Sequence, residues 1–450
     1  MAGNHVLLET IALTQSAASV TFDNLPTSGY TDLKVVMSAR LTSAGYDSTP
    51  WNSGNIAFNG TTITSGKLLA GTGSAAVSDN NAAAAFTTDT NATANTFGNF
   101  EMYVPNYRSS NNKSVSVDLV TENNGTASVC VLEAILSTVT SPITTISFTP
   151  TGGYSYAANS TFSLYGIAAF GTTPVLAPKA TGGNRVENDG TYWIHTFLTS
   201  GTFTPQTNLT CDYLVVAGGG AGGGGNNAGG GGAGGLRSTV TATGGGGSLE
   251  TALSISNGTN YPITIGAGAS GTSSTGLAAS GSNSTFSTIT STGGGGGYGG
   301  DTSGQKGANG GSGGGNNYAS SGTPATGTTN QGFSGGTGNP NSPYQAGGGG
   351  GAGEAGNTDA LADGGDGVAV SITGSSVTYA GGGGGGINTG SSATSTGGTG
   401  GGGNGASNVA PYAAVSGTAN TGGGGGGATN ANPTAGNGGS GIVIIRYPIA

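Results

Sequence analysis

Few side chains of this protein carry a charge, and that shortage excludes several classes of partner. Charged residues make up 6% of the 450-residue chain, with 10 basic against 19 acidic side chains and a formal net charge of −9. Nucleic acids are bound through clusters of Lys and Arg, so we expect no nucleic-acid partner. Because no apolar run approaches the length of about 18 residues that crosses a bilayer, we also expect no membrane insertion.

Cysteine and histidine are equally scarce, with two of each. A metal site needs more ligands than this, so we interpret Cys130 and Cys211 as buried free thiols, and we expect no metal and no cofactor. His5 and His195 lie in strand patterns, where packing or surface positions are more common than proton transfer. The first residues, Met1–His5, contain no basic segment of the kind that begins a secretion signal, so we expect release by lysis of a cell.

Short enzyme motifs occur here only in forms that chance explains. A G-x-S-x-G pattern, which in hydrolases places a nucleophilic serine on a turn, occurs at 310–314 and 332–336. That part of the chain is rich in glycine and serine, and no histidine follows His195. Asp359, Asp363 and Asp366 lack the spacing of an EF-hand calcium loop, and we interpret them as solvated loop carboxylates. We therefore expect a protein that is not an enzyme.

Glycine is the residue that the chain has in excess, with 97 in total and 79 of them after residue 217. They gather in runs at 218–220, 222–225, 229–232, 244–247, 293–297, 347–351, 381–386, 400–403 and 422–427. Collagen is excluded because the run 381–386 has no X or Y positions and the chain has only 15 prolines. Ordinary helices and strands are disfavoured because glycine costs roughly 0.5–1 kcal/mol more than alanine to order.

Two structures remain for the glycine runs, a disordered tail and a bundle of polyproline-II-like helices with three residues per turn. Such helices have no internal hydrogen bonds, so their N–H and C=O groups point outward and neighbouring helices can satisfy them. Only a residue without Cβ lets backbones approach that closely. The spacers favour the bundle because they contain apolar strand patterns, which need a sheet to bury them. These patterns lie at 261–265, 285–290, 368–372, 376–379 and 441–447.

Residues 1–170 predict a separate all-β unit, a β-sandwich that is jelly-roll-like. Alternating apolar and polar residues, as in Val115–Leu119, are typical of strands with one buried face. Strands are expected at 5–13, 19–22, 32–41, 55–58, 98–104, 114–121, 128–136, 144–148 and 161–169. One long loop is expected at 66–96, and residues 171–186 are interpreted as a linker.

The glycine-rich domain is expected to span 187–450. Its first strands, within 187–217, include a hairpin formed by 190–197 and 201–205 that leads into the apolar strand 212–217. Polyglycine runs and their loops fill 218–441. The strand 442–447 is expected to pair with the first strands, because this would fix both ends of a domain that is poor in side chains.

Several of these segments resemble the glycine-rich domain of bacteriophage tail-fibre and other virion structural proteins. They are Tyr213–Gly220 (Tyr-Leu-Val-Val-Ala-Gly-Gly-Gly), Gly201–Thr204, the repeated strand-to-polyglycine units and the ending Gly438–Tyr447. The first half is similar to a recurrent phage structural module at Ser19–Phe22, Tyr30–Val36, Tyr103–Tyr107 and Ser163–Ile167. In related phage adhesins, polyglycine-II helices pack into a sandwich whose distal loops recognise the host. This chain differs from them in its unequal runs and long spacers.

The resemblance implies a non-enzymatic virion fibre or adhesin protein on the particle surface, as a tail fibre or on the capsid exterior, made in the host cytoplasm. Its expected partners are a host cell-surface glycan or outer-membrane protein, other virion proteins bound through the N-terminal domain, and further copies of the chain in a trimer. The alternative is a purely structural decoration protein of the capsid or tail surface that binds no receptor.

Glycan recognition uses aromatic faces together with amide and hydroxyl groups, and several spacer loops offer this mixture. The candidate ligand-binding residues are Tyr298, Asn316, Asn317, Tyr318, Asn341, Tyr344 and Tyr412. Any single tyrosine could equally cap the end of a glycine run and cover its backbone. Both interpretations stay open from the sequence.

Overall fold

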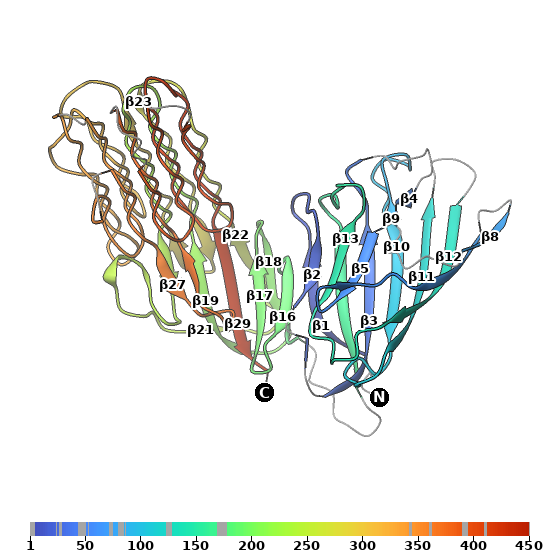
Figure 1. Cartoon of the computed structure of the whole chain (residues 1–450). Coiled ribbons are helices and arrows are strands. Elements are labelled where there is room, and N and C mark those ends of the chain that lie inside the picture. The colour runs from blue at the N-terminus through green and yellow to red at the C-terminus, as the bar shows by residue number, and fades with distance from the viewer. Residues whose placement is uncertain are drawn as a thin grey trace. The chain divides into compact units, whose positions relative to one another are not determined.

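The structure is a computed structural model that describes residues 5–23, 25–26, 29–43, 51–52, 54–71, 75–79, 85, 87–122, 128–168, 178–341, 344–359, 362–388, 395–408 and 412–449. Within these ranges the regular elements are β-strands apart from one 3-10 turn, which confirms the predicted all-β class (Figure 1). None of the described segments forms a helix long and apolar enough to cross a bilayer.

Contacts divide the chain into two compact units. The first comprises Met1–Pro178, Asn184–Trp193 and Pro448–Ala450, and the second comprises Lys179–Gly183 and Ile194–Tyr447. The expected boundary at residue 187 differs from this division, because Asn184–Trp193 groups with the first unit.

Among the described residues, the first unit contains two antiparallel sheets and one separate pair of two-residue strands. Within it the larger sheet has the order β16-β1-β14-β3-β10-β11-β12-β7-β8, and the smaller has the order β2-β13-β5-β6. The larger sheet is formed by β1 (His5–Ala12), β3 (Tyr30–Ala39), β7 (Gly66–Gly71), β8 (Ala76–Asp79), β10 (Gly98–Val104), β11 (Lys113–Glu122), β12 (Ser128–Ser137), β14 (Thr161–Ala168) and β16 (Arg185–Asn188). The smaller is formed by β2 (Val20–Phe22), β5 (Gly54–Phe58), β6 (Thr61–Thr62) and β13 (Ile146–Pro150).

A hydrophobic core lies between these two sheets. Side chains alternate along the strands, so that Leu33 and Val35 of β3 point into the core and are fully buried. Phe148 of the smaller sheet contacts Phe100 and Phe162 of the larger, with ring centroids 5.8 and 6.2 Å apart. The unit is therefore the predicted β-sandwich, while a jelly-roll order of its strands stays a prediction.

Two expectations for the first part of the chain are wrong. The segment 66–96, expected as one loop, contains β7, β8 and β9 (Thr87–Thr88), which pairs with β4 (Trp51–Asn52). The small and polar residues of this segment give no strand pattern. Its strands form because they pair with neighbours, as β7 does with β12. The expected linker contains β15 (Ala180–Thr181) and β16, which pairs with β1. Its residues 171–177 lie outside the described part of the chain.

The first and last strands close the second unit, as predicted. β19 (Leu209–Val216) pairs antiparallel with β29 (Ile442–Pro448), from Asp212↔Arg446 to Val216↔Ile442. β17 (Tyr192–Phe197) lies on the other side of β29, and both β20 (Leu236–Ser238) and β21 (Leu253–Ile255) pair with β19.

A second sheet of this unit has the order β15-β18-β22-β24-β25. It is formed, besides β15, by β18 (Gly201–Pro205), β22 (Tyr261–Thr264), β24 (Ser284–Phe286) and β25 (Ile289–Ser291). The expected hairpin of 190–197 with 201–205 is wrong, because β17 and β18 lie in different sheets. The expected single strand 285–290 is instead a hairpin, since the chain turns at Ser287, whose φ is 53°.

Two further strand pairs complete the unit. β23 (Gly276–Leu277) pairs with β26 (Tyr298–Gly299), and β27 (Val368–Val370) pairs with β28 (Val377–Tyr379). The strand patterns at 261–265, 368–372 and 376–379 are thereby confirmed.

The glycine runs pack as polyproline-II-like helices, which confirms the predicted bundle. In the run 218–223 successive N–H groups donate in three directions, at N–O distances of 2.9–3.1 Å. Their acceptors are the carbonyls of Ser282, Gly439 and Gly232, and one turn later Ala279, Gly436 and Gly229. When the donor advances by three residues along its helix, the acceptor moves back by three residues along its own. Each of the three neighbours therefore runs antiparallel to this helix, which has three residues per turn.

The carbonyls of the same run complete the lattice. Those of Gly218 and Ala221 accept from the N–H groups of Gly294 and Gly297, both at 2.9 Å. Here the donor and the acceptor both advance by three residues, so the neighbouring helix that contains Gly294 and Gly297 runs parallel to the first. The backbone groups that a polyproline-II helix leaves unpaired are therefore satisfied from outside, as buried backbone groups must be.

Close backbone contact explains why these positions are glycine. A Cβ added to Gly219 would lie 2.1 Å from the carbonyl oxygen of Gly423, far inside any ordinary contact. Alanine occurs where several helices leave room for a methyl group, as in the buried clusters Ala221/Ala269/Ala278 and Ala228/Ala428/Ala435. One expected run is an exception, because 244–247 contains a 3-10 turn with positive φ at Gly245 and Gly246.

Candidate binding site at the loop end of the glycine-rich unit

Loops that join the polyglycine helices meet at the end of the second unit opposite β19 and β29, where Figure 1 places β23. Hydrogen bonds connect them: the N–H of Gly300 donates to Asn226 O at 3.1 Å, and that of Asn388 donates to Tyr344 O at 3.2 Å. We define the loop end as residues 225–227, 272–277, 298–302, 317–320, 339–341, 344–345, 387–388, 407–408, 412 and 429–433. Of the predicted binding residues, all but Asn316 lie at the loop end, and Asn316 adjoins it.

Tyr318 and Tyr344 form the aromatic centre of the loop end. Their rings meet edge to face, with centroids 5.9 Å apart and an interplanar angle of 88°. Tyr344 is 42% exposed, and Tyr318 is half-buried. Burial, together with the nearby Asp301 carboxylate, raises the pKa of the Tyr318 phenol. The pair presents aromatic surface and hydroxyl groups side by side, from two different loops.

Three of the predicted residues have roles inside the unit instead. Asn317 is fully buried, and its Nδ2 donates to the carbonyls of Gly300 and Thr302 at 2.6 and 2.9 Å. Asn316 is 1% exposed. Both are therefore corrected to structural residues, because no ligand in solution reaches them. Tyr298 lies half-buried in β26, where its carbonyl accepts from Gly229 N and continues the lattice.

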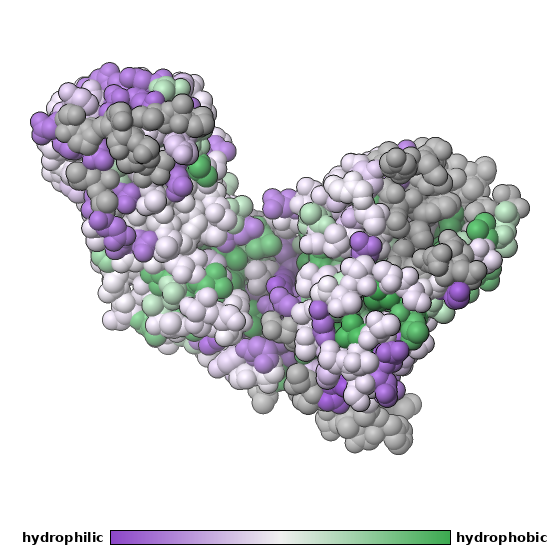
Figure 2. Space-filling model, viewed as in Figure 1, coloured by the Kyte–Doolittle hydropathy of each residue, from purple (hydrophilic) through white to green (hydrophobic). Residues whose placement is uncertain are grey.

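The remaining predicted residues are open to solvent. Asn341 is exposed, and its carbonyl accepts from Tyr344 N at 2.6 Å. Tyr412 is 49% exposed. Figure 2 shows that hydrophilic residues gather on this end of the unit. Hydroxyl, amide and aromatic groups without a strong net charge suit a neutral, hydrogen-bonding ligand.

Sequence reasoning missed a second role of asparagine, which is to satisfy N–H groups along the glycine helices. Oδ1 of Asn357 accepts from Gly348 N, and Oδ1 of Asn283 accepts from Gly293 N, both at 2.8 Å. Oδ1 of Asn437 accepts from Gly271 N at 2.7 Å. Such side chains accept hydrogen bonds that the carbonyls of neighbouring helices accept elsewhere in the lattice. The signal was available, since the spacers between the runs are rich in asparagine.

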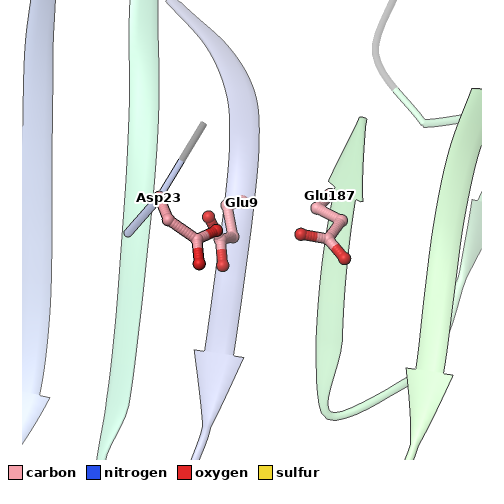
Figure 3. A group of neighbouring side chains, drawn as sticks. All are labelled: Glu9, Asp23 and Glu187. Atoms are coloured by element: carbon pink, nitrogen blue, oxygen red, sulfur yellow. The ribbon is translucent and has the colours of Figure 1, made fainter. Parts of the chain in front are cut away.

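Sequence reasoning also missed a group of three carboxylates in the first unit, whose ligand atoms lie within 4.8 Å of one another. Figure 3 shows Glu9 on β1, Asp23 after β2 and Glu187 on β16. Arg185 pairs with all three, at 2.6 Å to Glu9, 2.8 Å to Glu187 and 3.0 Å to Asp23. Burial raises the pKa of Glu9 to about 8, with Arg185 acting in the opposite direction. The group is an ion-pair network that ties β16 to β1 and to the end of β2.

The acidic residues considered from the sequence mostly bind backbone. Oδ1 of Asp363 accepts from Thr396 N at 2.8 Å, and Oδ1 of Asp366 accepts from Thr399 N at 2.6 Å. Glu354 and Asp359 lie close to Asp366. These contacts assign Asp363 and Asp366 to loop capping.

His195 and Cys211 are buried, and Cys130 is exposed. The expectation of a buried thiol is therefore wrong for Cys130, which lies on the outer face of β12. His195 packs between strands, with Nε2 2.9 Å from the Tyr447 hydroxyl and Nδ1 2.7 Å from Gly182 O. Burial lowers the pKa of His195 to about 4.

A lattice of polyglycine helices held between short β-strands defines the second unit as a glycine-rich structural domain. The family described as glycine-rich domain matches residues 197–448, which is more than half of the chain, and the protein belongs to this family. Comparison with curated proteins and with solved structures found no match.

Proposed function

We propose that the chain is a non-enzymatic fibre or adhesin protein of a virion. Its β-sandwich attaches it to other virion proteins, and the loop end of its glycine-rich unit recognises a host-surface glycan or outer-membrane protein. The observation that carries this proposal is the gathering of exposed Tyr344, Tyr412 and Asn341 at one end of a hydrogen-bonded lattice. The resemblance of Tyr213–Gly220 to phage tail-fibre proteins supports the assignment to a virion.

The lattice of polyglycine helices holds the loops of the loop end in place, which favours recognition by these loops. Loops on a rigid scaffold carry binding residues in many proteins, and they lose little conformational entropy on binding when they are already held. Here the loops are anchored by helices that bond to neighbours on several sides. Aromatic rings with a polar tip are well suited to surfaces that are part apolar and part hydrogen-bonding, as sugars are.

The test is the double substitution Tyr318→Ala/Tyr344→Ala, because the two rings contact each other and a single change would leave half of the surface. The probes are an array of bacterial lipopolysaccharides and capsular polysaccharides, and whole bacterial cells. Binding is expected to weaken at least about tenfold, which corresponds to about 1.4 kcal/mol. Leu249→Ala serves as the control, since Leu249 is 48% exposed but lies outside the loop end.

Circular dichroism of the double variant should match that of the unaltered protein, since neither ring is fully buried. Binding that is equal in the double variant and in Leu249→Ala would remove the loop end as the recognition surface.

A further inference from the structure

The outer face of β12 in the first unit carries an uninterrupted apolar strip. Its outward positions are Cys130, Leu132, Ala134 and Leu136, all exposed, and Leu132 is 58% exposed. The inward positions, such as Val131, fill the core. When an antiparallel sheet packs on a core with one face, its other face is normally polar where it meets water. Four successive apolar positions outward are therefore unusual for a face that stays in solvent.

Neighbouring strands widen this strip. Leu69 of β7 lies directly opposite Leu132 and is 55% exposed. Val120 of β11 lies opposite Cys130 and is 45% exposed. We call the outer face of β7, β12 and β11 the apolar face. The apolar face has an acidic residue on one side of β12 and a basic residue on the other, namely Asp118 on β11 and Lys67 on β7.

We propose that a second copy of this chain packs on the apolar face, sheet against sheet, about a two-fold axis parallel to β12. Such an axis places the β7 side of one copy over the β11 side of the other. Lys67 of each copy then faces the strand that carries Asp118 of the other, while the leucines of β12 face one another. An apolar strip with a basic margin on one side and an acidic margin on the other is complementary to itself.

The apolar face is long and narrow. β11 and β12 have 10 residues each, which gives a length of about 34 Å, and the three strands β7, β12 and β11 cover about 14 Å of width. The projected area is therefore about 480 Å², below the value of about 800 Å² per partner in stable specific interfaces, which places the pair among the smaller and weaker interfaces.

The first test is the mass of the full chain in solution, measured by light scattering at micromolar concentration. We expect twice the chain mass of 42.6 kDa for the unaltered protein. Leu132→Asp should reduce this to one chain mass, because two carboxylates would be buried against each other. Leu249→Asp, an exposed leucine in the other unit, should keep the mass of the pair. A single chain mass for the unaltered protein, a mass of three or more copies, or an unchanged pair in Leu132→Asp would overturn the proposal.

Cys130 supplies a second test that needs no destabilising variant. Packed sheets lie about 10 Å apart, so the Cys130 thiols of the two copies lie within reach of a short bismaleimide. Cys211 is fully buried, which leaves Cys130 as the accessible thiol. Covalent pairs should form in the unaltered protein and be lost in Cys130→Ser and in Leu132→Asp. Absence of covalent pairs in a sample that scatters as a pair would place the contact elsewhere and refute this geometry.

Discussion

Replacing Gly231 by alanine tests whether close backbone contact holds the second unit together. A Cβ at this position would lie 2.2 Å from the carbonyl oxygen of Gly220, whereas ordinary contacts begin at 3.4 Å. The neighbouring helix would therefore have to move by about 1.2 Å, the difference between these distances. Gly220, which would move, donates to Gly232 O at 2.9 Å and accepts from Gly425 N at 3.0 Å.

The cost follows from these two hydrogen bonds. A buried backbone group that loses its partner costs about 1–3 kcal/mol, so two of them cost about 2–6 kcal/mol. Alanine restricts the unfolded chain more than glycine does, which returns about 0.4–1 kcal/mol. We therefore expect Gly231→Ala to lower the free energy of unfolding of the second unit by about 1–5.6 kcal/mol.

Gly322 offers a matched control in the same unit. A Cβ there meets nothing within 4 Å, and its φ lies outside the left-handed region. Gly322→Ala should be neutral or stabilise the unit by about 0.4–1 kcal/mol. The assay is urea unfolding, monitored by hydrogen-exchange mass spectrometry on peptides that cover 218–235. Amides in these peptides should exchange slowly in the unaltered protein. Equal unfolding free energies for the two variants, or unprotected amides throughout the glycine runs, would refute the packed lattice.

Two further predictions concern buried ionisable groups. Lys113 is 1% exposed, and its Nζ lies 2.7–3.0 Å from the carbonyls of Ser109, Asn111, Val139 and Ser141. Lys113→Met should destabilise the first unit by about 2–4 kcal/mol in urea unfolding, and an unchanged midpoint would contradict this role. The pKa of His195 is lowered to about 4 in the folded chain, so the unfolded chain takes up the proton first. Stability should be fully present above about pH 6.5 and fall by about 1.4 kcal/mol per pH unit toward pH 4. His195→Gln should flatten this slope in pH-dependent unfolding, and an unaltered slope would assign it to other groups.

The position of several candidate residues could be predicted from the sequence, because composition alone separates polar spacer loops from glycine runs. Tyr318 and Tyr344 are aromatic residues in polar spacers, and both lie at the loop end. Their contact could not be predicted, since it depends on which helices are neighbours. Asn316 and Asn317 lie in a spacer of the same composition, yet their side-chain amides point inward and bond to the backbone. Local sequence does not tell a ligand-binding amide from one that satisfies a carbonyl.

The sequence by itself determined the all-β class, the polyglycine helices and the pairing of the first and last strands of the second unit. Each rests on a local property, such as the Cβ that glycine lacks or the apolar run Leu214–Val216. Only the tertiary structure decided which helices are parallel neighbours and which face of β12 meets solvent. A run of glycines has no side chains with which to select a partner, so the order of the lattice comes from the strands, alanines and loops around it. The pairing of β12 likewise depends on β7, a strand whose own sequence does not show it.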